Sequence, residues 1–330
     1  ISEGEIVAIP WGGTPSVQYY KGKFVTSDNR IATSNDIEIL DNKFLFYWML
    51  NNIELIGSYY RGPGIQHPDM SKVLDTIIPV PPLPVQKEIV RILDKFTELE
   101  AQLDAELQAR EKQYAHYRDA LLDFSPDKPR IGSKHSRLNK LIETLCPDGV
   151  EYSSLGDVCD VLDKQRKPVT RKDRISGVYP YYGANGIQDY VKDYLFDGTF
   201  LLIGEDGSVI NKDNSPVLTW AEGKIWVNNH AHVLGETTKA SLRFIYYYLQ
   251  TIDISSIVRG IPPKINQQNL RNINVPVPPL PVQKEIVRIL NQFDTLVNDI
   301  KQGLPAEISA RRKQYEYYRD KLLTFKEKQA

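Results

Sequence analysis

The sequence predicts an α+β protein in which two mixed α/β globules are separated by two long helices that pair as an antiparallel coiled coil. Two observations lead to this fold class. Fifteen residues, PVPPLPVQKEIVRIL, occur at 79–93 and return unchanged at 276–290. Each copy is followed by apolar residues at steps of three, four or seven, which is the spacing of a coiled-coil seam. A repeat this long is not accidental, so the chain is an internal tandem repeat with pseudo-two-fold symmetry.

Residues 1–80 form the first predicted globule, made of short strands and loops. Strands are predicted from Gly4 to Ile9 and over 22–25, with a glycine- and proline-containing turn at 11–15 between them. The apolar run FLFYWML at 44–50 has no period that separates a helix from a strand. A basic, glycine-rich loop follows at 61–67.

Residues 81–124 form the first predicted spacer helix. The proline run at 79–84 excludes helix interior, whereas Pro84 and Pro281 suit a first helical turn. Glu100 and Arg110 fall where the seam asks for apolar residues, which predicts a locally hydrated or asymmetric interface. Hairpin packing inside one domain is the alternative, although about 40 residues at about 1.5 Å each is long for a globular core. The residues predicted to pair the two helices are Ile89, Leu93, Phe96, Leu103 and Leu107 in the first, and Ile286, Leu290, Phe293, Ile300 and Ile308 in the second.

The rest of the chain repeats this order, with a linker or short ordered connection at 125–148, a second globule at 149–278 and a second spacer helix at 279–330. The second helix has four extra residues midway, where Gly303 and Pro305 predict a kink or break. The first globule has no counterpart of roughly 149–197. Either the chain starts inside a longer gene product or its first globule is reduced.

Composition narrows the class of protein. The net charge of −1 is not that of a wholly basic nucleic-acid binder, but 94–111 is acidic and 164–174 is basic, so only some surfaces are suited to phosphate. Two cysteines support neither a disulfide framework nor a four-ligand zinc site. No apolar run approaches membrane-spanning length and no signal peptide opens the chain. A soluble, cytoplasmic protein is expected.

No catalytic residue and no metal site are predicted. His230 and His232 stand two apart on an expected strand, but the sequence places no third ligand nearby, so they are interpreted as ordinary surface histidines. The Gly204 to Gly207 segment contains carboxylates but is typical of a turn. The Ile261-Pro-Pro-Lys264 stretch lacks the Asn or Asp and the aromatic ring of an amino-methyltransferase motif. Catalysis is therefore expected from partners.

Several of these segments resemble the specificity subunit of type I restriction-modification enzymes. The resemblance is carried by PLPVQKEIVRIL at the start of both helices, KQYEYYRDKLLTF at 313–325 and LCPDGVEYSSLGDV at 145–158. It implies two target-recognition domains that each read half of a bipartite, asymmetric DNA site, with the helices as spacer. It also implies a non-catalytic chain whose partners are double-stranded DNA, two modification (adenine methyltransferase) subunits and restriction (translocase and nuclease) subunits, with no membrane. S-adenosylmethionine, ATP and Mg are expected on those partner subunits and no cofactor in this chain.

Candidate DNA-binding residues follow from charge and from the hydrogen-bonding groups that read phosphates and base edges. A solvated charged loop and a structural aromatic turn are the alternatives for 164–174 and 181–185, and the repeated Arg61 and Arg259 either fix loops or hold phosphate. A non-DNA scaffold that offers PPLP segments and coiled coils to partners is the alternative function. The candidates in the second globule are Lys164, Arg166, Lys167, Arg171, Lys172, Arg174, Tyr181, Tyr182, Asn185, Arg259 and Lys264; those in the first are Thr14, Gln18, Lys21, Lys23, Arg61, Gln66 and His67.

Overall fold

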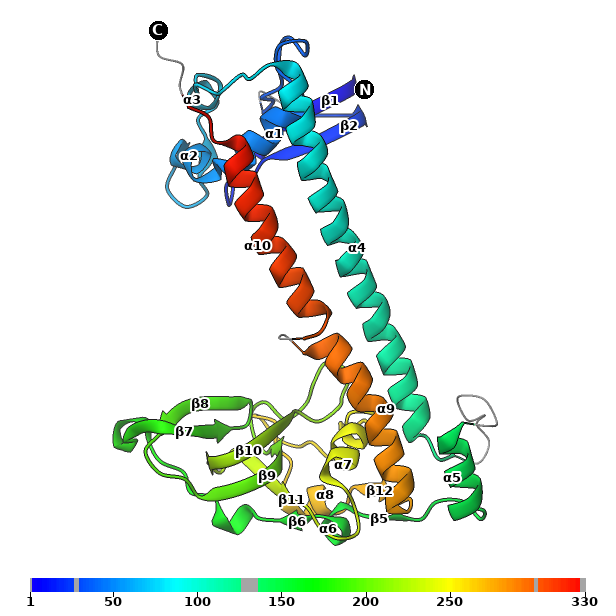
Figure 1. Cartoon of the computed structure of the whole chain (residues 1–330). Helices are drawn as coiled ribbons and strands as arrows, with labels where there is room; N and C mark the ends of the chain where they lie inside the picture. Colours follow the sequence, from blue (N-terminus) through cyan, green and yellow to red (C-terminus); the bar gives the residue numbers. More distant parts are fainter. Residues whose placement is uncertain (1, 27–29, 126–135, 300–301, 327–330) are drawn as a thin grey trace. The chain divides into compact units, whose positions relative to one another are not determined.

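The computed structural model describes residues 2–26, 30–125, 136–299 and 302–326 (Figure 1). The chain divides into two compact units, of which unit 1 comprises 1–108 with 299–330 and unit 2 comprises 109–298. Helix α4 (Leu83–Leu122) is continuous and contributes its first part to unit 1 and its last part to unit 2.

The strands of unit 1 are short and antiparallel. Strand β1 (Ser2–Ala8) pairs with β2 (Gln18–Phe24), and Gly4 lies directly opposite Gly22. A second hairpin joins β3 (Tyr60–Arg61) to β4 (His67–Pro68). The predicted strands at 4–9 and 22–25 therefore exist, although β2 begins four residues earlier than its predicted start.

The apolar run at 44–50 belongs to helix α1 (Asn42–Asn51), which contacts β1 and β2. The Asp41 side chain accepts hydrogen bonds from the backbone N–H groups of Lys43 and Phe44, so this helix has a capped start that the apolar run alone does not reveal. Helices α2 (Ile53–Ser58) and α3 (Met70–Leu74) follow. Phe44, which is fully buried, belongs to the core of this unit.

Within unit 1, α4 packs antiparallel against α10 (Leu304–Leu323). Phe96 stacks on Tyr318 with 5.6 Å between ring centroids, and the Arg312 guanidinium lies 2.5 Å from the Glu100 carboxylate. The predicted polar interruption at Glu100 is therefore an ion pair between the helices. The seam residues of unit 1 are buried or half-buried, namely Ile89, Leu93, Phe96, Leu103, Leu107 and Ile308.

Unit 2 contains a six-stranded sheet in the order β6-β11-β9-β10-β7-β8. All pairs are antiparallel except β10 with β7. In the hairpin of β9 and β10, Gly198 lies opposite Gly223, as Gly4 lies opposite Gly22 in unit 1. The bounds are β6 Asp160–Val161, β7 Ser176–Gly183, β8 Gly186–Val191, β9 Phe196–Gly204, β10 Leu218–Val227 and β11 Ala231–Gly235.

Helices cover this sheet and extend from it. Helix α7 (Leu242–Leu249) contacts both β9 and α9 (Leu280–Asn298), and Phe293 of α9 stacks on Tyr117 of α4 with 5.2 Å between ring centroids. Ile286 and Leu290 are fully buried. The remaining elements are α5 Arg137–Leu145, β5 Tyr152–Ser154, α6 Leu155–Val158, the 3-10 turns η1 Asp163–Gln165 and η2 Arg171–Asp173, α8 Gln267–Arg271 and β12 Asn274–Pro276.

The second spacer helix is broken, as predicted. Helix α9 ends at Asn298 and α10 begins at Leu304, with Pro305 in its first turn. Ile300 lies outside the described residues, as do 126–135 of the predicted linker, whereas 137–145 form helix α5. Together these elements confirm the predicted α+β class with an internal repeat. Among the helices of the described ranges, none is both long and apolar enough to cross a membrane.

Candidate nucleic-acid interface

Residues 163–174, which we call the basic segment, connect β6 to β7 through η1 and η2. Arg166 points inward, with 12% of its side chain exposed. Its Nη1 donates hydrogen bonds to the Glu205 carboxylate at 2.6 Å and to the Ala231 carbonyl at 2.7 Å. The structure therefore gives Arg166 an internal role in place of the predicted DNA contact. Its guanidinium donors bind Glu205 and the Ala231 carbonyl and so fix the basic segment to the rest of unit 2.

Arg174 is the second inward anchor of the basic segment. Its guanidinium carbon lies 4.2 Å from the centre of the Tyr181 ring, an arrangement that favours a cation–π interaction. Its Nε donates to the Val169 carbonyl at 3.1 Å, and Nη1 lies 3.2 Å from the Asp189 carboxylate. Arg174 thus ties the end of the segment to β7 and β8.

Four basic side chains of the segment are exposed and form no ion pair with any described residue. We call Lys164, Lys167, Arg171 and Lys172 the outward cations. The backbone beneath them is held, since Trp226 Nε1 donates to the Lys167 carbonyl at 2.6 Å and the Lys167 N–H donates to the Val227 carbonyl at 3.2 Å. Unpaired cations on an anchored backbone suit the binding of phosphates.

The aromatic candidates on β7 are interior residues. Tyr181 is 1% exposed and Tyr182 is 7% exposed, and the Tyr181 hydroxyl accepts a hydrogen bond from the Val169 N–H at 3.0 Å. Burial raises the pKa of Tyr182. The structure thus corrects the expectation that these rings face bases, because the sheet and the basic segment cover them. Asn185, by contrast, is exposed in the turn between β7 and β8.

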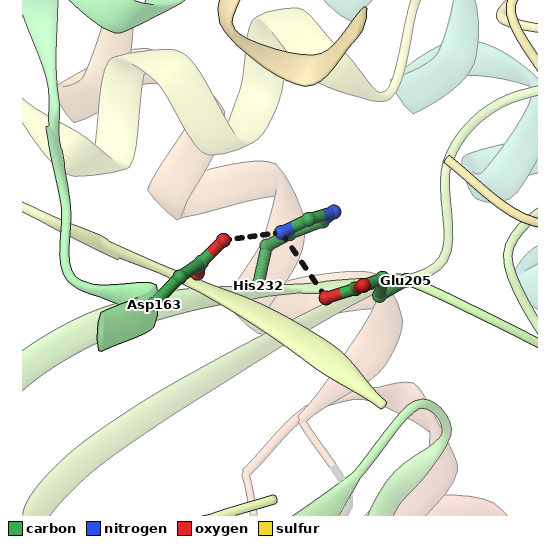
Figure 2. A group of neighbouring side chains, drawn as sticks. All are labelled: Asp163, Glu205 and His232. Carbon is green, nitrogen blue, oxygen red and sulfur yellow. Dashed lines mark hydrogen bonds and ion pairs between the residues drawn. The ribbon is translucent and has the colours of Figure 1, made fainter. Parts of the chain in front are cut away.

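His232 lies at the centre of a buried polar cluster with Asp163 and Glu205 (Figure 2). Its Nδ1 is 2.6 Å from Asp163 and 3.5 Å from Glu205, and its Nε2 donates to the Ile265 carbonyl at 2.9 Å. The interpretation of His232 as an ordinary surface histidine was wrong, because its side chain is fully buried. Its two acidic neighbours come from segments far apart in the sequence, which no local spacing marks. His230, just before β11, is exposed as predicted.

The carboxylates of this cluster already have donors. Asp163 accepts from the Val233 N–H and from Gln267, and Glu205 is paired with Arg166 and with Lys264 at 3.1 Å. Burial pushes the pKa of Asp163 upward, but the hydrogen bond and charge of His232, together with the hydrogen bonds from the Val233 N–H and Gln267, outweigh it and leave that pKa below its usual value. A metal ion would have to displace these donors, so we interpret the cluster as a tie between η1, β11 and the loop after β9.

The hairpin that bears Arg259 and Lys264 lies beside the turn after β9. Lys264 pairs through its backbone with both Arg259 and Asp206, and the Gly207 N–H donates to the Pro263 carbonyl at 2.9 Å. Both basic side chains are exposed. The predicted turn at 204–207 is therefore part of a pair of contacting loops rather than an isolated feature.

Unit 1 brings together a similar pair of loops. His67 Nδ1 lies 2.5 Å from the Trp11 carbonyl, so the hairpin of β3 and β4 contacts the turn after β1. Arg61 donates to the carbonyl of Tyr60, as Arg259 does to that of Val258, which supports a loop-fixing contact for each arginine. Lys21 is paired with Glu5 on the neighbouring strand. The exposed candidates of this unit are Thr14, Gln18, Lys21, Lys23, Arg61 and Gln66, and His67 is half-buried.

Sequence reasoning did not single out Trp226, although it holds the backbone of the outward cations. The contact joins positions 59 residues apart, and no local spacing marks it. The only sequence signal was its place in a strand-like stretch at 223–230 that echoes 22–29.

Comparison with known proteins defines the class of this chain. Residues 1–109 and 147–310 match the family described as the type I restriction modification DNA specificity domain. The chain belongs to this family.

Among its relatives, the specificity subunit of the type I restriction enzyme EcoR124I/EcoR124II of Escherichia coli is 31% identical over 322 residues, which cover 92% of this chain and 76% of that protein. A putative type I restriction enzyme specificity subunit of Haemophilus influenzae is 42% identical over 195 residues, covering 58% of this chain. The match spans 49%, about half, of that relative. The crystal structure of an S subunit from M. genitalium has the same fold, with a TM-score of 0.64 at 19% identity over 98% of this chain and 84% of the other.

Proposed function

We propose that the chain is the DNA sequence-recognition subunit of a type I restriction-modification complex and reads a bipartite, asymmetric site. The observation that carries the proposal is the set of outward cations on an anchored segment of unit 2, within a specificity-domain fold. Contacts to phosphate position a protein on DNA, and nearby loops then read base edges. The exposed loops that contain Asn185, Arg259 and Lys264 supply such groups in this unit.

The proposed partners are modification and restriction subunits, which supply methyl transfer and cleavage with S-adenosylmethionine, ATP and Mg. The proposal gives this chain no catalytic role of its own. It is favoured over a polyproline scaffold because Pro81 and Pro278 use their carbonyls to accept hydrogen bonds from buried glutamines at the helix starts. These segments therefore have a structural use within the units.

The experiment compares two lysines of unit 2. The full chain, with and without modification subunits, is titrated with fluorescent duplexes, and Lys167→Ala is compared with Lys284→Ala on α9. Loss of a phosphate contact weakens binding to all sequences and lowers the slope of log K against log salt by about one. Lys284→Ala is expected to leave the slope unchanged. Equal slopes for Lys167→Ala and the wild type would exclude the basic segment from the interface.

A further inference from the structure

Each unit contains one short hairpin whose tip consists of glycine, proline and isoleucine. In unit 2 the hairpin runs from Arg259 to Lys264, and in unit 1 it joins β3 to β4 and begins at Arg61. Ile261 is fully exposed and Ile65 is 68% exposed. A single exposed isoleucine needs no explanation. The same side chain at the tip of an arginine-led hairpin in both units indicates a use for it.

The backbone of the hairpin in unit 2 is closed at its base. The Arg259 N–H donates to the Lys264 carbonyl at 2.9 Å, and the Lys264 N–H donates to the Arg259 carbonyl at 2.7 Å. Between these residues, Pro262 and Pro263 fix two of the φ angles. Ile261 is therefore presented by a constrained loop, so little conformational freedom is lost when its side chain enters a binding partner.

The buried polar cluster joins this hairpin to the basic segment. The Glu205 carboxylate pairs with Arg166 of the basic segment at 2.6 Å and with Lys264 of the hairpin at 3.1 Å. His232 adds a second connection, because its Nδ1 lies 2.6 Å from Asp163 (Figure 2) and its Nε2 donates to the backbone carbonyl that follows the hairpin at 2.9 Å. The cluster thus fixes the hairpin relative to the backbone that bears the outward cations.

The hairpin of unit 1 is held in a comparable way. Its strands pair at Arg61 and His67, and the His67 ring contacts the Trp11 carbonyl. The Ile65 side chain lies against Gly12 of the same turn and remains largely exposed. Each unit therefore presents an aliphatic side chain on a fixed loop that starts with an exposed arginine.

An aliphatic side chain flanked by cations suits duplex DNA that is opened at one base step. Isoleucine is among the side chains that enter such a step from the minor groove, where they partly unstack it and kink the duplex by about 20–90°. Cations beside the step bind the flanking phosphates, and this attraction offsets part of the cost of unstacking. In an apolar pocket of a protein the same cations would have to be desolvated or paired.

We propose that Ile261 and Ile65 are wedges, each of which enters a base step of one half-site and kinks the DNA there. The inference rests on the proposed function, since it requires that the chain binds DNA. It adds a mode of recognition that depends on how easily the DNA deforms. A step that unstacks readily, such as TA or CA/TG, is favoured at the wedge even though no base edge is read there.

Bending of a defined duplex tests the proposal. The full chain with its modification subunits is mixed with a duplex that carries the site mapped by methylation sequencing, with a donor and an acceptor dye at its two ends. Energy transfer is expected to rise when the wild type binds. The rise should fall by about half for Ile261→Ala or Ile65→Ala and almost vanish for the double variant, because each removes one kink.

Two further variants separate a wedge from other contacts. Ile261→Leu should keep the bend, since leucine also acts as a wedge. Leu145→Ala is the matched control, because Leu145 is an exposed aliphatic residue on α5 of the same unit. Ile261→Ala should leave the slope of log K against log salt unchanged, whereas loss of a phosphate contact lowers it by about one.

The possible failures are distinguishable. Equal bending by the wild type and the double variant would overturn the wedges and leave the proposed function in place, as would tight binding of the site without any bend. A wild type that does not prefer the site duplex to a scrambled one would overturn the proposed function and the wedges with it. An unchanged bend together with weaker assembly of Ile261→Ala with the modification subunits would show that Ile261 contacts a protein instead of DNA.

Discussion

Gln86 and Gln283 make the same three hydrogen bonds at the same place in the two units. Gln86 Oε1 accepts from the Asp41 N–H at 2.8 Å, while its Nε2 donates to the carbonyls of Ile39 at 2.8 Å and Pro81 at 2.7 Å. Gln283 Oε1 accepts from the Ser241 N–H at 2.9 Å, and its Nε2 donates to the carbonyls of Lys239 at 3.3 Å and Pro278 at 2.8 Å. Both side chains are 0% exposed.

This shared arrangement gives a physical reason for part of the unchanged repeat. In each unit one amide joins the proline run, the start of the long helix and the residues that precede the globule's own helix. Each unit has a further hydrogen bond between its globule and its long helix. The Tyr47 hydroxyl donates to Asp94 of α4 at 2.6 Å, and the Tyr247 hydroxyl donates to Asn291 of α9 at 2.7 Å. The globule is therefore fixed to its helix by directional bonds as well as by apolar packing.

Replacing Gln86 with Leu is expected to destabilise unit 1 by about 2–4 kcal/mol. The leucine keeps the volume but leaves buried backbone donors and acceptors unsatisfied, and each such group costs about 1–3 kcal/mol. Urea unfolding of the full chain, followed by hydrogen exchange to separate the two units, measures the change. Gln102→Leu is the control, because Gln102 is exposed and its side chain bonds to Glu98 on its own helix. A Gln86→Leu variant as stable as the control would show that the three hydrogen bonds of Gln86 contribute little to the stability of unit 1.

The Asp163 cluster predicts a loss of stability of unit 2 in acid. The pKa of Asp163 is lowered in the folded state, so its contribution is present above the unfolded pKa of about 3.9 and is lost as the pH falls through the folded value. Asp163→Asn is expected to reduce stability at neutral pH by about 3 kcal/mol, because Arg166 and His232 lose a buried partner. It should also flatten the loss of stability that the wild type shows as the pH falls below about 5.

Unfolding free energies of the wild type and the variant across this pH range test the prediction. Asp193→Asn, at an exposed position of the same unit, controls for the loss of one carboxylate. Parallel pH profiles for the wild type and Asp163→Asn would contradict the assignment of acid sensitivity to this cluster.

The sequence was most informative where structure depends on local pattern. The proline-led helix starts, the polar interruption at Glu100 and the break before Pro305 all follow from periodicity and from backbone constraints that act within a few residues. The inward direction of Arg166 and the burial of Tyr181 depend instead on contacts with residues 12 to 65 positions away. The helical state of the run at 44–50 likewise depends on packing, since a fully apolar stretch carries no period. Charge alone therefore identified the basic segment but did not separate its anchors from its outward cations.

The two spacer helices are expected to set the distance between the half-sites. Phe96 pairs with Tyr318 inside unit 1 and Tyr117 with Phe293 inside unit 2, so four residues inserted after Gln108, with four more after Gln302, leave both pairs intact. Four residues add about 6 Å at about 1.5 Å each, which corresponds to at most about two base pairs of about 3.4 Å. In the continuous helix α4 the four residues add a rotation of about 400°, which leaves its seam about 40° out of phase, and a stutter can absorb this. The insertion after Gln302 falls in the break between α9 and α10. Methylation-site mapping of the variant with its modification subunits should show a longer non-specific spacer between unchanged half-sites. Alanine substitution of Gln108 and Gln302, the two insertion points, without insertion should leave the spacer as it is. A changed half-site with an unaltered spacer would show that the helices do not act as the ruler.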